Sequence, residues 1–136
     1  MATMPEAVRE TFERVSAVVL CTADEGAQPN GCVVAMKAVI DDQTVYLSDQ
    51  FFRKTLANLT ANDKVAIVFW DGEGAYQIHG TARYVNDGEE FLEQKAWVDA
   101  AFASRGVPIT AKGGVFVSVE DVFEVAGGPN AGKSLL

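Results

Sequence analysis

The sequence predicts a mainly β protein, a small antiparallel barrel of about six strands with a few flanking helices. Most apolar segments are short and alternate apolar with polar residues, the period of two that is typical of half-buried strands. Apolar residues at helical spacing occur only near the start, in the middle and late in the chain. Strands and helices therefore do not alternate as they do in parallel βαβ folds, and an antiparallel barrel is the expected architecture.

The composition indicates a single domain whose negative net charge is unfavourable for binding polyanions. The 136 residues are 49% hydrophobic and 22% charged, so we expect one domain over 1–136 with a sizeable core. Nineteen acidic and eleven basic residues give a net charge of −8, which argues against nucleic acid and anionic membranes as partners. No apolar run approaches the ~20 residues that cross a bilayer, and the N-terminus lacks a signal-peptide pattern. We expect a cytoplasmic protein.

The first third of the chain predicts a helix and then a hairpin. Val8, Phe12 and Val15 fall at helical spacing, with Thr3 as a possible N-cap, so a helix within 1–16 should cover the core. The elements expected next are a strand over 17–22, a turn over 23–28 and a strand that opens at 29–31 and runs over 32–40. Cys21 and Cys32 then lie near each other across the hairpin. They fit no zinc or CxxC pattern, and a reducing cytosol disfavours a disulfide, so we expect two small buried apolar residues.

The rest of the chain continues this pattern of short strands and turns. The expected elements are strands over 44–48, 64–70, 75–85, 115–119 and 121–125, and helices beginning near Thr55 and over 89–103. The long loop over 104–114 separates the last helix from the final strands.

The segment from Val45 to Leu59 is the most informative, because a strand ends there in a polar turn and a helix begins. The start of a helix presents unpaired N–H groups and the positive end of its dipole. Arg53 and Lys54 add two cations at this point, and Ser48 and Thr55 add hydroxyls. A phosphate monoester is the ligand that such a corner favours. The alternative is that both cations are simply solvated, since cations oppose the dipole at a helix start.

A second phosphate motif lies at the C-terminus. Residues 127–134 match the G-x-x-x-x-G-K-[ST] pattern, which needs a following helix to hold phosphates. Only Leu135 and Leu136 follow, so we interpret the match as chance in a flexible tail over 127–136. Such a tail could still fold over a ligand or a neighbouring subunit.

Three segments in this order resemble the FMN-binding split-barrel family, which includes pyridoxamine 5′-phosphate oxidase. Residues 46–54 are similar to its segment of an aromatic residue, a serine or threonine and a closing [RK]-K pair. Asn58 with residues 62–66 resembles the helix end and the following N-[PD]-[KR]-V turn, and residues 77–82 resemble its sixth-strand pattern ending in Gly-x-Ala. The likeness runs from about Val18 to Val85.

The resemblance implies a six-stranded antiparallel split barrel of Greek-key type and a homodimer that binds FMN in a groove between its subunits. By matched position, Arg53 and Lys54 would hold the phosphate, with a hydroxyl from Thr55. Ser48 and Asp49 would lie along the ribityl chain and the flavin edge. The strand beside it would offer the main-chain groups of Asn30, Gly31 and Cys32 to the isoalloxazine ring. Apart from the resemblance, Lys37 ends an apolar strand segment and could reach the flavin ring; the alternative is that it is solvated, as strand-end lysines usually are.

The sequence also departs from the oxidase. It is shorter and lacks the basic and aromatic C-terminal residues that hold a pyridoxal substrate, so it looks more like the small FMN-binding proteins or flavin reductases. The lone His79 has no metal partners, and Trp70 and Trp97 could wall a flavin or belong to the core or a dimer interface. We find no catalytic acid–base pair. We expect an FMN-dependent oxidoreductase or electron carrier; the alternative is a flavin-free dimer that serves as a small-molecule binding or sensing module.

Overall fold

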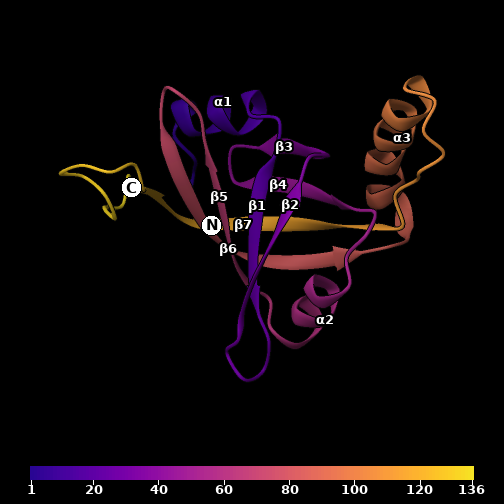
Figure 1. The fold of residues 1–136 in the computed structure, drawn as a ribbon, viewed down its shortest axis with the longest axis horizontal. Helices are drawn as coiled ribbons and strands as arrows, with labels where there is room; N and C mark the ends of the chain where they lie inside the picture. Colours follow the sequence, from indigo (N-terminus) through magenta and orange to yellow (C-terminus); the bar gives the residue numbers. More distant parts are fainter.

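The computed structural model describes all residues, 1–136, as one antiparallel sheet that curls into a half-open barrel with three helices (Figure 1). The elements in chain order are α1 (Glu6–Arg14), β1 (Val18–Ala23), β2 (Pro29–Val34), β3 (Lys37–Asp41), β4 (Thr44–Asp49), α2 (Lys54–Ala61), β5 (Lys64–Trp70), β6 (Ala75–Val85), α3 (Gly88–Ser104) and β7 (Gly113–Glu124). The strand order is β2-β1-β5-β6-β7-β4-β3. The mainly β class and the split-barrel architecture are confirmed.

The sheet has seven strands where six were expected. The segment expected as one strand over 32–40 divides, because β2 pairs with β1 and ends at Val34, whereas β3 pairs with β4 from Lys37. The same piece of chain thus supplies both outer edges of the sheet. The two strands expected at 115–119 and 121–125 are instead one strand, β7, whose pairing with β6 shifts register between His79 and Gly80.

The core fills the inside of the curled sheet and is closed at its two ends by helices. Val8 and Phe12 of α1 are fully buried, and the Phe12 ring meets Phe69 edge-on at 5.3 Å between centroids. This confirms α1 as a cover on the core, although the N-cap is Pro5 rather than Thr3. In Figure 1, α2 lies at the opposite end of the barrel and α3 stands outside it, beyond the ends of β6 and β7. None of the three helices has the length and apolarity to cross a membrane.

The C-terminal tail folds back along the last residues of β7, beyond the part of this strand that pairs with β4. The Glu124 N–H donates to Lys133 O at 3.1 Å, and the Leu135 N–H donates to Val122 O at 2.8 Å. Ser134 forms a bridge with Phe123, and no helix follows Lys133. The residues that match the phosphate-loop pattern therefore form an edge segment, which cannot supply the helix amides that the motif requires.

Candidate functional site

The predicted corner between β4 and α2 is present, with α2 beginning at Lys54 and Arg53 as its N-cap residue. No side chain caps this helix, and its first backbone bond runs from the Ala57 N–H to Arg53 O at 3.1 Å. The N–H groups of residues 54–56 thus precede the helical ladder and remain available to an acceptor. The side chains of Arg53 and Lys54 are exposed and take part in no ion pair within the chain.

A buried polar network fixes the start of α2 against β1 and β2. Asn30 Nδ2 donates to Thr55 Oγ1 at 3.1 Å and to Thr22 Oγ1 at 3.2 Å. Asn58 Nδ2 donates to the same Thr22 oxygen at 3.0 Å. Thr22, Thr55 and Asn58 are all buried, so these bonds are shielded from water and hold the helix start in one position.

An apolar groove of about 370 Å³ lies next to this corner. Eight of its eleven lining residues are hydrophobic; they come from the end of β2 and the following link, from the turn after β4 and from the end of α3. The lining residues are Cys32, Val33, Val34, Ala35, Met36, Ser48, Gln50, Phe51, Phe52, Phe102 and Arg105. Because β2 is an edge strand with a single neighbour, one row of its backbone groups faces away from the sheet.

Several predicted site residues gather around this groove. Cys32 and Ser48 line it, and the Ser48 hydroxyl accepts a hydrogen bond from Gln50 Nε2 at 2.5 Å. Asn30 and Thr55 are linked beside it, and Gly31 is exposed between Asn30 and Cys32. Sequence reasoning missed Gln50, Phe51, Phe102 and Arg105. Phe51 carried a usable signal, because an aromatic residue in a polar turn is unusual, and in the structure its exposed fraction is 72%. Phe102 near the end of α3 and Arg105 just after it carried none.

Two predicted site residues point elsewhere. The Lys37 ammonium donates to Phe12 O at 2.6 Å and lies over the Phe12 ring at 5.2 Å, so it is committed to α1, and burial lowers its pKa. The Asp49 side chain is fully buried, and its two oxygens accept bonds from the Phe52 N–H and the Tyr84 hydroxyl. Neither residue lines the groove.

The two cysteines are free thiols. Cys21 pairs with Gly31, and Cys32 pairs with Leu20, so the two side chains leave the hairpin on opposite faces. Burial raises the pKa of both thiols, which keeps them protonated near neutral pH. Both thiols are only partly buried, where buried residues were expected.

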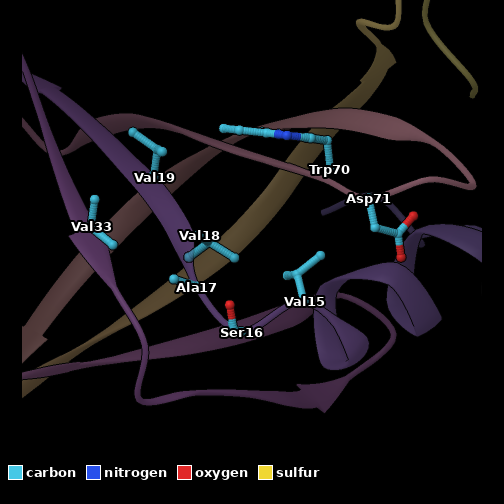
Figure 2. A pocket seen from close by; sticks show the side chains of 8 residues that line it. All are labelled: Val15, Ser16, Ala17, Val18, Val19, Val33, Trp70 and Asp71. Atoms are coloured by element: carbon cyan, nitrogen blue, oxygen red, sulfur yellow. The ribbon is translucent and has the colours of Figure 1, made fainter.

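A second hollow, of about 410 Å³, lies at the end of α1 beside β1, β2 and β5 (Figure 2). Figure 2 shows Val33, Val19 and Trp70 around it, with Val15 on the opposite side and Asp71 as its one charged group. The exposed fractions of Val33 and Trp70 are 75% and 57%. This hollow has no cation and no helix start, so it suits an apolar contact rather than a phosphate.

The other aromatic and imidazole groups weighed from the sequence lie outside the groove. His79 is exposed and its ring packs against Phe123 at 4.7 Å between centroids. Trp97 is partly buried on α3 and donates its Nε1–H to Gln94 Oε1 at 2.8 Å. No group of three potential ligands among histidine, cysteine and carboxylate side chains is placed to hold a metal ion.

Comparison with known proteins identifies the family of this chain. The sequence matches the family described as pyridoxamine 5′-phosphate oxidase over residues 4–125. A relative from Methanocaldococcus jannaschii, described as uncharacterized protein MJ0282, is 36% identical over 121 residues, which cover 85% of this chain and 77% of that protein.

Solved structures reproduce the fold. HupZ of Group A Streptococcus gives a TM-score of 0.77 at 24% identity, over 95% of this chain and 99% of that one. An FMN-binding protein from Syntrophomonas wolfei subsp. wolfei gives 0.74 at 18% identity, over 89% and 85%. An F420 reductase and HutZ, the heme storage protein from Vibrio cholerae, share the fold as well, each with a TM-score of 0.66. Because the family match spans nearly the whole sequence and the architecture agrees, the chain belongs to the pyridoxamine 5′-phosphate oxidase-like family of FMN-binding split barrels.

Proposed function

We propose that this protein binds FMN and acts as a flavin-dependent oxidoreductase or electron carrier. The observation that carries the proposal is the uncapped start of α2, which bears two unpaired cations and adjoins an apolar groove. A phosphate dianion gains most from charge-assisted donors, and a flat aromatic ring gains most from an apolar wall. The phosphate and the isoalloxazine ring of FMN meet these two requirements.

Each part of the corner has a distinct role in the proposed complex. Arg53 and Lys54 bind the phosphate together with the N–H groups of the first turn of α2, and Thr55 adds its hydroxyl. The groove takes the isoalloxazine ring, with the free edge of β2 from Asn30 to Cys32 beside it. When bound, the flavin supplies the electron or hydride chemistry, while the protein binds, orients and excludes water.

We also propose that the protein works as a homodimer. Val33 and Trp70 are large apolar side chains that are mostly exposed, and both border the apolar hollow of Figure 2. Exposed apolar surface of this kind favours contact with another protein surface. A second copy would cover it and would bring a further wall to the flavin groove.

The phosphate role is tested by titrating the purified protein with FMN and with riboflavin, which lacks the phosphate. In the double variant Arg53→Ala and Lys54→Ala, the FMN dissociation constant should rise by about 100-fold or more, because two bonds to a charged group are lost, each worth ~1.5–3 kcal/mol. Riboflavin binding should change by no more than about twofold. Lys133→Ala serves as the matched control, since that lysine lies in the tail and should affect neither ligand.

Other outcomes have defined meanings. An equal loss for both ligands would remove the phosphate role from Arg53 and Lys54. A colourless protein whose melting temperature does not rise with FMN would favour the flavin-free binding module, because a ligand that binds the native state must stabilise it. Hemin is a useful further probe, since one protein with this fold is named for heme storage.

A further inference from the structure

Asp49 does not behave like a surface residue at the end of a strand. Its exposed fraction is 0%, and its side chain lies on the inner face of β4 with Val45 and Leu47 of the core. Oδ1 accepts the Phe52 N–H at 2.8 Å, and Oδ2 accepts the Tyr84 hydroxyl at 2.5 Å. A buried carboxylate persists only when donors satisfy it, so these bonds define the conformation of the turn over 49–52.

Lys112, the residue just before β7, holds the same turn. Its backbone N–H donates to Asp49 O at 3.0 Å, and its ammonium donates to Phe52 O at 3.1 Å. The ammonium also lies 3.9 Å from Asp49 Oδ1. The turn is thereby fixed at its first and last residues by two groups that are distant in sequence, Tyr84 of β6 and Lys112 just before β7.

The position of this turn determines the position of the cationic corner, which consists of Arg53, Lys54 and the start of α2. Phe52 immediately precedes Arg53 and Lys54, and the Phe52 backbone is bound on both sides, through its N–H to Asp49 and through its carbonyl to Lys112. Burial and the hydrogen bond to Asp49 raise the pKa of the Tyr84 phenol, so the hydroxyl stays a donor. A shift of this turn would move both cations and the first amides of α2.

We propose that Asp49, Tyr84 and Lys112, here called the Asp49 brace, are positioning residues for phosphate recognition. They act through the turn on Arg53, Lys54 and the start of α2, without contacting the ligand. The proposal rests on the proposed function of the corner and assigns Asp49 an indirect role in place of the direct one along the flavin edge.

The first experiment is hydrogen exchange on the ligand-free protein. Tyr84→Phe removes one oxygen and leaves the ring in place. It should speed exchange of the Phe52 and Ala57 amides, which are hydrogen-bonded to Asp49 Oδ1 and Arg53 O, by about tenfold, the effect of losing one bond worth ~1.4 kcal/mol. Lys112→Met keeps a chain of similar length and should act in the same direction. Tyr76→Phe is the matched control, because that tyrosine is on the same strand and its hydroxyl makes no hydrogen bond within the protein.

The second experiment compares FMN with riboflavin in the same variants. Tyr84→Phe and Lys112→Met should weaken FMN binding by about tenfold and riboflavin binding by no more than about twofold. The proposal would be overturned if both variants kept the wild-type ratio of FMN to riboflavin affinity, or if exchange of the Phe52 and Ala57 amides were unchanged. If the wild-type protein binds no FMN, the proposed function fails by itself, and the exchange measurement alone still decides whether the brace holds the turn.

Discussion

Two tyrosines on opposite faces of the sheet show how differently a buried hydroxyl can be used. Tyr84 of β6 lies on the core side, and its phenol packs against Gly113 and donates to Asp49. Tyr46 of β4 is on the other face, packs against Gly114 and Phe116, and is fully buried, whereas Tyr84 is partly buried. Its hydroxyl has no hydrogen-bond partner in the protein.

Tyr46 and Tyr84 pack in the same way but differ in the hydrogen bonds of their hydroxyls. Both tyrosines require a glycine of β7 beneath the phenol, so their packing demands are alike. Only Tyr84 also satisfies a carboxylate, and only that hydroxyl is connected to the cationic corner. The hydroxyl of Tyr46 loses its hydrogen bonds to water on folding and gains none in return. This lowers the free energy of unfolding, and the cost is large because the group is fully buried.

The largest expected effect tests the feature that the two tyrosines share, the close packing of each phenol on a glycine of β7. A Cβ at Gly113 would overlap the Tyr84 phenol, and one at Gly114 would overlap the Tyr46 phenol. Gly113→Ala and Gly114→Ala should therefore each lower the free energy of unfolding by about 3 kcal/mol, as overpacking against a rigid neighbour does. Urea denaturation measures this. Gly72→Ala is the control, because no atom lies within 4 Å of its added Cβ; if all three variants matched the wild type, the close approach would be wrong.

The next effect tests the feature in which the two tyrosines differ, the hydrogen bonding of the hydroxyl. Tyr84→Phe should lower the free energy of unfolding by about 1.5 kcal/mol, because a buried carboxylate loses a donor. Tyr46→Phe should leave it unchanged or raise it by up to about 1 kcal/mol, because an unpaired hydroxyl is removed from an apolar site. Denaturation of the two single variants under the same conditions gives the contrast directly. Equal losses in both would mean that the Tyr46 hydroxyl has a partner after all.

The same residues show what the sequence could and could not predict. The cationic corner was predictable, because an alternating strand, a polar turn and a helix start follow one another within residues 45–59 and need only local patterns. Helices α1, α2 and α3 were predictable for the same reason. The break between β2 and β3 was not, because it depends on which strand each half pairs with, and pairing is decided by the whole sheet.

Asp49 illustrates the limit within the site. Its place at a strand end beside cations is typical of a ligand-facing residue, and the sequence contains nothing that turns it inward. The donors that do so are far away in the chain: Tyr84 is 35 residues from Asp49, and Lys112 is 60 residues from the Phe52 carbonyl that it binds. Such contacts have no local signature. The positions of Phe102 and Arg105 at the groove depend in the same way on how α3 packs.

The smallest expected effect concerns pH and sharpens the contrast at Tyr46. Burial raises the pKa of the Tyr46 phenol from its ordinary value of 10.0 to about 12. In the unfolded chain the phenol ionises from about pH 10, whereas the folded protein keeps it protonated. The stabilising contribution of the neutral phenol is therefore complete below pH ~10 and is lost as the pH rises towards 12. At about pH 11 the wild type should have lost ~1 kcal/mol relative to Tyr46→Phe, compared with their difference at about pH 8. Free energies of unfolding measured for both proteins across this range provide the test, and a difference that stays constant with pH would show that the Tyr46 phenol ionises as readily in the folded protein as in water.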